Sequence, residues 1–389
     1  MLSEPFDGSG RLVASRPMTN LSSRAQLRTR VVAESLARKV LARVSSDPPE
    51  PATQESPAPP APDPTPVETA PPAPENFIRE VAPGHFADPQ QNRASTLLYE
   101  RLSPEDLTEI QQHINEVGDL QLQYADAYNE AARRHMILAF GVWLEVPCVP
   151  EKTSLVKIQP PEEIHVMTRG PLASAGGLYE ADMVVDALMS AGMDMTDVKS
   201  ALDFGCSSGR VLSVLRAAYP QTSWHGCDPN EPAIAWATEN LPGIEFFVNG
   251  NEPPLPLADG SLDLVYAISI WSHFAPELGL RWFQEMHRLI RPGGHLVCTT
   301  HGLTSVAHES RGRSQQQSEE ILDALYRHRS WYAPEFGEEG DWGVVNPDWG
   351  TAFLSLEWML TQLCPRWRVL EFAPGRNQEN QDVYVLQRV

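Results

Sequence analysis

Two carboxylates and a small-residue turn are the groups in this chain whose spacing has the clearest chemical meaning. The stretch Ala201–Leu212 reads as a short apolar strand, a turn containing Gly205 and Gly209, and the start of a helix. Glycine has no Cβ, so such a turn can be tight and a ligand can approach its backbone, while the helix N-terminus offers N–H groups to an anion. Asp228 ends a second strand, where a carboxylate can accept hydrogen bonds from both hydroxyls of a ribose. The pattern predicts a nucleotide-like ligand.

Two histidines follow later strands and could move a proton. His273 lies after a fourth predicted strand, and His301 lies directly after a fifth. Because ligands of an open α/β sheet bind at the carboxyl ends of its strands, both are expected at one edge. An imidazole titrates near neutrality and suits removal of a proton from a hydroxyl. Either histidine could instead have a packing or hydrogen-bonding role, and we favour His301 as the base because Trp271 and Phe274 can draw His273 into packing.

Five short apolar segments, interleaved with helical segments, must position these groups. The first ends at Phe204, and the second and third are expected at Ser223–Asp228 and Ile244–Asn249. The fourth follows a turn at Leu255–Asp263, and the fifth follows a turn at Arg291–Gly294. A last pair of strands is expected at Trp367–Ala373 and Asp382–Arg388. Strands that alternate with helices indicate an α/β fold with a parallel sheet.

These blocks, in this order and spacing, resemble the class I S-adenosylmethionine-dependent methyltransferases. An NAD-binding Rossmann domain would share the first two blocks and would not predict the last two. The resemblance covers about residues 178–389. It implies an enzyme with a Rossmann-like fold, a seven-stranded and mostly parallel sheet with an antiparallel last strand, and S-adenosylmethionine as the cofactor. The four matching blocks are the Asp203–Gly209 loop, the Asp228 strand tip, the Leu255–Asp263 turn and the Arg291–Gly294 turn.

The resemblance assigns six residues to cofactor binding. Ser207 replaces the usual middle glycine of the loop. Asn251 replaces the usual acid near the adenine amino group, and its amide oxygen can still accept a hydrogen bond there. From the residues alone, Asp203 could instead order its loop, and Asp228 could instead cap the helix that begins at Pro229. The six are Asp203, Gly205, Ser207, Gly209, Asp228 and Asn251.

The resemblance places His273 and His301 on the acceptor side of the transferred methyl group. Trp271, Trp342 and Trp349 are expected to bind the acceptor, because an aromatic face can stack on a ring while polar groups meet its hydroxyls; the alternative is that these tryptophans pack the insertion against the domain. By resemblance to methyltransferases associated with bacterial glycan assembly, we expect O-methylation of a sugar-containing or polyhydroxylated small molecule. The alternatives are an aromatic natural-product acceptor and a non-catalytic, cofactor-binding scaffold subunit.

Composition disfavours several classes of function. The chain has 389 residues, and its formal net charge of −21 disfavours binding to nucleic acid or to an anionic membrane. Its five cysteines show no metal-binding or disulfide spacing, so we expect no metal and a reducing cytoplasm. No stretch has the apolar length of a transmembrane helix, and the N-terminus lacks the apolar core of a secretory signal. A cytoplasmic protein without a membrane span is expected.

The N-terminal residues 1–76 differ from the rest. Residues 21–44 interleave arginines and lysine with leucines and valines, which predicts a short basic amphipathic helix. Such a helix is barely stable alone, or it docks on an acidic protein partner or on the enzyme's own acidic body. Residues 47–74 are mostly Pro, Ala, Glu and Thr, which predicts a disordered, extended linker.

A helical cap and a wrapping segment are expected at residues 94–177. Ser103 followed by Pro104 and two acids is a typical helix start, and Ser103–Val146 reads as two helices or one kinked helix. The proline-punctuated segment Pro147–Pro171 is expected to wrap to the site. The methyltransferase-like domain follows at 178–389, with an insertion at 303–350.

Overall fold

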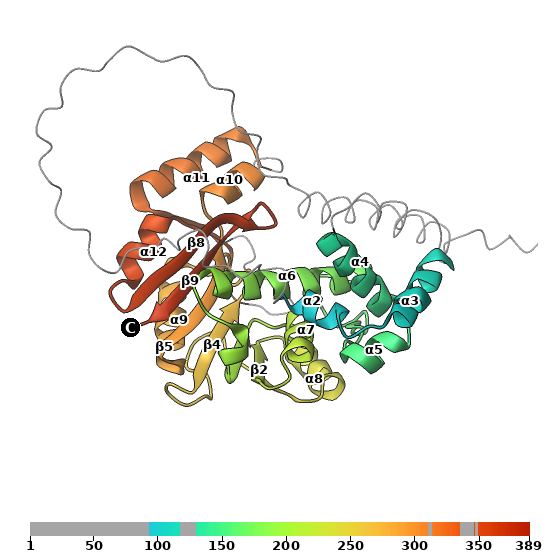
Figure 1. The fold of residues 1–389 in the computed structure, drawn as a ribbon. Helices are drawn as coiled ribbons and strands as arrows, with labels where there is room; N and C mark the ends of the chain where they lie inside the picture. Colours follow the sequence, from blue (N-terminus) through green and yellow to red (C-terminus); the bar gives the residue numbers. More distant parts are fainter. Residues whose placement is uncertain (1–92, 117–129, 310–312, 335–345, 347–348) are drawn as a thin grey trace, which may run out of the picture.

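The computed structural model describes residues 93–116, 130–309, 313–334, 346 and 349–389 (Figure 1). The predicted basic helix at 21–44, the predicted linker at 47–74 and Trp342 lie outside the described residues. Within the described part of the chain, no helix has both the length and the apolar character needed to cross a bilayer.

A seven-stranded sheet forms the centre of the molecule, with strand order β3-β2-β1-β4-β5-β9-β8 (Figure 1). The first five strands in this order are parallel, and β9 is antiparallel to both of its neighbours. The mostly parallel sheet with an antiparallel last strand is therefore confirmed. The strands are β1 Ser200–Phe204, β2 Ser223–Asp228, β3 Ile244–Val248, β4 Leu262–Ala267, β5 Ile290–Thr300, β8 Trp367–Asn377 and β9 Gln381–Arg388.

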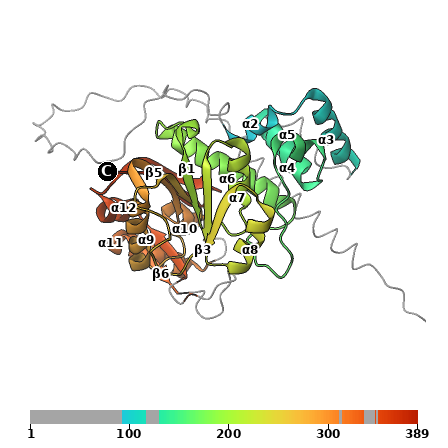
Figure 2. The same cartoon turned by 90° about the horizontal axis from the view of Figure 1, so that it is seen from below.

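Helices cover both faces of this sheet (Figure 2), and neighbouring residues of β4 show why. Leu264 and Tyr266 belong to the core beneath α6 and α7, whereas Val265 belongs to the core beneath α9 and α12. Side chains alternate between the faces of a strand, so an uninterrupted apolar strand requires a layer on each side. The helices nearest the sheet are α6 Pro171–Ser190, α7 Arg210–Ala218, α8 Glu231–Asn240, α9 Pro276–Leu289 and α12 Leu356–Leu363.

Four N-terminal helices extend the layer formed by α6 and α7 (Figure 1). At the start of α3, Ser103 Oγ accepts a bond from the backbone N–H of Asp106 (3.2 Å), and the Asp106 carboxylate accepts one from the Ser103 N–H (2.8 Å). This reciprocal capping fixes the start of the helix at the residue that the sequence predicts. The expected domain boundary at residue 178 falls inside α6, so the N-terminal helices and the sheet share one core. The four are α2 Ala94–Tyr99, α3 Pro104–Glu116, α4 Glu130–Trp143 and α5 Cys148–Thr153.

The segment between β5 and α12 forms a small subdomain at the carboxyl end of the sheet. Its two strands pair antiparallel, and Phe353 forms a bridge with His301 at the end of β5. A second bridge joins Trp349 to Phe274, in the loop after β4. The insertion therefore folds back onto the loops where the sequence places chemistry. Its elements are α10 Leu303–Glu309, α11 Gln315–His328, β6 Ser330–Ala333 and β7 Thr351–Leu354.

The turn between β8 and β9 is attached to α6 by one tyrosine. The Tyr179 hydroxyl donates to the carbonyl of Arg376 (3.0 Å) and accepts from the N–H of Gln378 (3.0 Å). Beside it, the Arg376 guanidinium pairs with Asp186 of α6 at 2.8 Å. The hairpin therefore has a fixed position relative to α6, although 190 residues of sequence separate Asp186 from Arg376.

The Tyr179→Phe substitution tests this attachment. It removes two hydrogen bonds at a half-buried site, so we expect the free energy of unfolding to fall by about 1 kcal/mol, together with faster amide exchange at residues 376–381. Chemical denaturation and hydrogen exchange measure the two effects. Tyr326→Phe is the matched control, because Tyr326 is 89% exposed. Equal behaviour of the two variants would contradict the attachment.

Candidate functional site

The turn between β1 and α7 has the backbone that the sequence predicts. Gly205, Ser207 and Gly209 have φ of +87°, +48° and +80°, a region that costs a residue with a Cβ about 1 kcal/mol or more. A Cβ on Gly205 would also overlap the side chain of Ile270. Ser207 adopts a left-handed conformation where the family usually has glycine. The turn ends at Gly209, and α7 begins at the next residue.

Asp228 is the last residue of β2, and its carboxylate orders the loop between β1 and α7. One carboxylate oxygen accepts from the N–H of Ser207 (2.8 Å), and the other accepts from the N–H of Asn230 (2.8 Å). Burial raises the pKa of Asp228, and the two backbone N–H groups lower it. The residue that caps α8 is Asn230, whose side chain accepts from the Ala233 N–H. Asn230, rather than Asp228, therefore caps α8, and the Asp228 carboxylate faces the loop between β1 and α7.

Asp203 ends β1 deep in the same site. Its side chain accepts a hydrogen bond from the Tyr266 hydroxyl at 3.0 Å. Burial raises its pKa to about 8, and the neighbouring carboxylates of Glu180 and Asp228 act in the same direction. A carboxyl group in this environment is costly to ionise, and the Tyr266 hydroxyl and the Arg210 guanidinium offset that cost only in part. The arrangement favours a ligand that brings positive charge.

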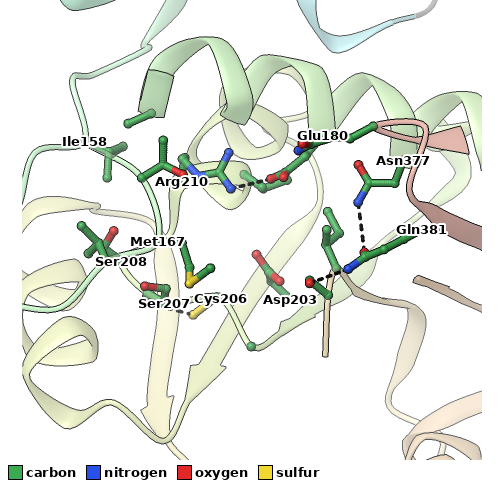
Figure 3. A pocket seen from close by; sticks show the side chains of 18 of the residues that line it. Ile158, Met167, Glu180, Asp203, Cys206, Ser207, Ser208, Arg210, Asn377 and Gln381 are labelled. Atoms are coloured by element: carbon green, nitrogen blue, oxygen red, sulfur yellow. Dashed lines mark hydrogen bonds and ion pairs between the residues drawn. The ribbon is translucent and has the colours of Figure 1, made fainter. Parts of the chain in front are cut away.

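Two adjoining cavities lie at the carboxyl end of the parallel strands. The larger has a volume of about 370 Å³ and contains Asp203 and the loop residues (Figure 3). The smaller has a volume of about 120 Å³ and contains Asp228, His273 and Trp349. Ligand sites of open α/β sheets lie at this position. The residues common to both cavities are Met167, Gly205, Ser207, Ile268 and Ser269.

The larger cavity includes charged residues that the sequence reasoning missed. Glu180 of α6 and Arg210 of α7 form an ion pair at 2.6 Å on one wall (Figure 3). Gly176 lies under the guanidinium, and a Cβ there would be 2.7 Å from Arg210 Nη1. Arg210 directly follows the predicted loop, so its position was a usable signal. The position of Glu180 gave no such signal. Glu180 lies within an expected helix, and whether its side chain faces a cavity depends on tertiary packing.

Residues 154–170, which are rich in proline and connect α5 to α6, form a strap over the site. The cavities include Ile158 and residues 165–168 of this strap, and Met167 is 57% exposed. Arg169 holds the strap, because its guanidinium donates to the carbonyls of Pro160 (2.6 Å), Pro161 (2.8 Å) and Ile164. The wrapping segment thus reaches the site. The helices of the expected cap lie away from the site: of the described residues of α2–α5, none is among those that line the two cavities.

His273 lies in the wall of the smaller cavity. Its Nδ1 is 3.0 Å from the carbonyl oxygen of Gly350. A carbonyl can only accept, so Nδ1 carries the proton and the lone pair of the neutral ring is on Nε2. Burial lowers the pKa of His273, and the ring is neutral at pH 7.

His301 lies behind His273 rather than in either cavity wall. The two rings are 6.4 Å apart, and His301 Nε2 is 3.3 Å from the amide nitrogen of Gln381. Burial, reinforced by His273, lowers the pKa of His301 to about 3. Our preference for His301 as the base therefore differs from the geometry, which brings His273 to the cavity.

The three predicted tryptophans have different positions. Trp271 is fully buried, stacks on Phe283 with ring centroids 4.3 Å apart, and donates its indole N–H to Gly279. It packs in the core, which conflicts with the predicted contact to substrate. Trp349 is half-buried and lines the smaller cavity. Trp342 lies outside the described residues.

Two of the predicted cofactor residues, Gly209 and Asn251, line neither of the two cavities. Gly209 ends the turn before α7, whereas Asn251 is distant from it in the chain. Asn251 is exposed, three residues beyond the end of β3. A contact with the adenine remains a prediction. For metals, Asp106, Glu109 and Cys148 bring possible ligand atoms within 4.8 Å of one another, but none of the three lines either of these two cavities.

A known family of domains matches the central part of the fold. Residues 201–294 match the family model described as "Methyltransferase domain". This match covers β1 to the start of β5, including the loop and Asp228. The strand order and the antiparallel β9 agree with this match, so residues 201–294 form a methyltransferase domain, and the fold resembles that of the class I S-adenosylmethionine-dependent methyltransferases.

Curated relatives support the same class. The chain is 35% identical over 103 residues to the "Phthiotriol/phenolphthiotriol dimycocerosates methyltransferase 1" of Mycobacterium ulcerans, covering 26% of this chain and 37% of that one. It is 26% identical over 130 residues to a "Malonyl-[acyl-carrier protein] O-methyltransferase" of Hahella chejuensis, covering 30% and 46%. The chain thus spans less than half the length of these relatives.

Solved structures also resemble part of the chain in fold. One from Methanosarcina mazei, described as an S-adenosylmethionine-dependent methyltransferase, is 20% identical and covers 49% of this chain and 92% of its own, with a TM-score of 0.36. A protein of Pyrococcus horikoshii is 16% identical and covers 54% and 92%, with a TM-score of 0.38.

Arg169→Lys tests the strap. A lysine is a point charge and cannot donate to several carbonyls in the fixed geometry of a guanidinium. We expect affinity for S-adenosylhomocysteine, measured by calorimetry, to fall roughly tenfold, which is the loss of one to two hydrogen bonds to a charged group. Arg327→Lys is the control, because Arg327 is an exposed residue of α11 paired with Asp323. Unchanged affinity in Arg169→Lys would show that the strap needs no such support.

Proposed function

We propose that this chain transfers the methyl group of S-adenosylmethionine to a hydroxyl oxygen of a small-molecule acceptor. The observation that carries the proposal is the position of His273. This neutral imidazole lines a cavity that also contains Asp228 and the loop residue Ser207. A base for the acceptor and the residues for the cofactor therefore share one space. The relative from Hahella chejuensis is named as an O-methyltransferase, which supports an oxygen acceptor.

The residues present fit the cofactor. Asp228 would accept from the ribose hydroxyls, since a carboxylate has about four acceptor positions and two are used by backbone N–H groups. Arg210 and Glu180 would hold the carboxylate and the ammonium of the methionine part, because their opposite charges lie side by side in the cavity. When bound, the cofactor supplies an electrophilic methyl group on a positively charged sulfur.

His273 would take the proton of the acceptor hydroxyl. Its Nδ1 donates to Gly350, so Nε2 has the lone pair that a base requires. The lowered pKa keeps the ring neutral at physiological pH and ready to accept. The surrounding walls orient the acceptor and exclude water, which contributes through proximity.

The lining of the smaller cavity bears on the acceptor. Ile270, Phe274 and Trp349 supply an apolar and partly aromatic wall, and Ser269 and His273 supply polar groups. An aromatic wall beside hydroxyl and imidazole groups suits a sugar-containing or polyhydroxylated ring, whose apolar face stacks while its hydroxyls form hydrogen bonds. The apolar share of the wall equally favours the second candidate, an aromatic acceptor.

The decisive experiment compares metabolites with and without the enzyme. Cell extract is incubated with S-adenosylmethionine and the full chain, and mass spectrometry searches for products heavier by one methylene. Formation of S-adenosylhomocysteine that depends on the extract would support a transferase. Cofactor binding without any turnover would instead support a non-catalytic scaffold subunit. The fragmentation pattern of a product distinguishes a methylated sugar from a methylated phenol.

Asp228→Ala tests the cofactor site. We expect affinity for S-adenosylhomocysteine to fall by a few kcal/mol, because the ribose acceptor and the loop contact to Ser207 are lost together. NAD should not bind the wild type. Calorimetry measures both, with Asp259→Ala as the control, since the side chain of Asp259 is 81% exposed. Wild-type affinity in Asp228→Ala would rule out this role for the carboxylate.

His273→Gln tests the base. We expect kcat to fall by roughly two to four orders of magnitude, with affinity for S-adenosylhomocysteine unchanged. Because burial lowers the pKa of His273, the wild-type rate should fall only as pH drops below the ordinary value of 6.5, and this acidic limb should be absent from the variant.

Two further variants complete the comparison. His328→Gln, an exposed change on α11, should have no effect on turnover. His301→Gln should lower turnover less than His273→Gln, because His301 does not line a cavity. A full rate in His273→Gln would mean that another group takes the proton, or that the acceptor is acidic enough to need no base.

A further inference from the structure

We propose that Gly350, at the end of the inserted segment, is a positioning residue that fixes the orientation and the proton position of His273. The inference rests on the proposed function, in which His273 is the base. It adds a specific task for the insertion, whose residue Gly350 lies 77 residues from His273 in sequence.

Reciprocal hydrogen bonds join the two residues. His273 Nδ1 is 3.0 Å from the Gly350 carbonyl oxygen, and the Gly350 N–H donates to the His273 carbonyl oxygen at 2.9 Å. The same backbone pairing continues at Ala352, whose N–H donates to the carbonyl of Ser272 at 2.8 Å. Gly350 therefore holds both the backbone and the ring of His273.

Space, rather than backbone dihedral angle, makes residue 350 a glycine. A Cβ there would overlap the carbonyl oxygen of Ala333, and it would lie 2.9 Å from the carbonyl carbon of Ala333 and 3.0 Å from Cα of Pro334. These are backbone atoms at the end of β6, so no side-chain rotation can relieve the overlap. Ala333 is also paired with Thr351 of β7, which brings the two backbones together at this point.

A residue with a Cβ at position 350 must therefore shift its backbone to relieve the overlap with Ala333 and Pro334. This shift also displaces the carbonyl group of residue 350 relative to His273. The displacement weakens the hydrogen bond between His273 Nδ1 and the carbonyl oxygen of residue 350, which holds the proton on Nδ1. The two neutral tautomers of His273 then compete, and the one with a proton on Nε2 has no lone pair to offer at that nitrogen. The expected loss is one of base strength and orientation, while the cofactor residues on β1 and β2 keep their places.

The first experiment reads the tautomer directly. Full-length chain labelled with ¹⁵N-histidine is studied by NMR with S-adenosylhomocysteine, and the His273 signals are assigned by their absence in His273→Gln. We expect the wild type to carry its proton on Nδ1 and Gly350→Ala to show a mixture of tautomers. Gly250→Ala is the control, because a Cβ on Gly250 would meet only ordinary contacts from 3.6 Å. A proton on Nε2 in the wild type would overturn the proposal, even if Gly350→Ala fails to fold.

The second experiment uses turnover once an acceptor is available. We expect Gly350→Ala to lower kcat about tenfold or more, a part of the worth of a general base, with KM for the acceptor and affinity for S-adenosylhomocysteine little changed. If Gly350 acts through His273, the same substitution should add almost nothing to His273→Gln. An equal loss in both backgrounds would overturn the proposal. If the tautomers behave as expected and His273→Gln keeps full activity, the failure lies in the proposed base.

Discussion

The backbone of the turn between β1 and α7 is the constraint on which the site depends. Gly205 and Cys206 both donate to the carbonyl of Cys227 (2.9 and 3.0 Å), so the end of β1 is tied to the end of β2. The Ser207 N–H then reaches Asp228. A left-handed backbone at three alternate positions is needed for these bonds to form together. The strand ends, the carboxylate and the start of α7 are thus placed by one local conformation.

Three other parts of the site come from segments that are separate in sequence from this turn. The strap is held by Arg169, the β8–β9 turn is held by Tyr179, and the insertion contributes Trp349 and Gly350 beside His273. Each attachment is made chiefly through backbone carbonyl or N–H groups. Such attachments tolerate changes in neighbouring side chains, so the walls can vary in composition while the turn at β1 keeps its geometry. A methyltransferase fold can change its acceptor in this way, because function depends on loops placed by a rigid sheet.

The sequence predicted what is determined locally. The bounds of β2 follow from apolar residues between a turn and Asp228, and α3 begins after Ser103 because that side chain caps it. The loop after β4 was harder. Ser269 has φ of +61°, and a turn then brings the His273 N–H to the Ile270 carbonyl. This turn directs Trp271 into the core, contrary to our expectation, and His273 to the cavity, at the edge of the sheet where it was expected. Arg169 and Gly350 carried no signal, because their partners become neighbours only in the folded chain.

The charges of the site favour binding of the sulfonium cofactor over binding of its thioether product. Asp203 is buried, and the neighbouring carboxylates of Glu180 and Asp228 raise the cost of ionising it further. A positively charged sulfonium nearby would stabilise these ionised carboxylates, since an opposite charge favours the charged form. Loss of the methyl group leaves a neutral thioether, and that stabilisation is then reduced. The same carboxylates that favour a cationic cofactor therefore favour the neutral product less, and the neutral His273, which lines the smaller cavity together with Asp228, adds no positive charge that would offset this difference.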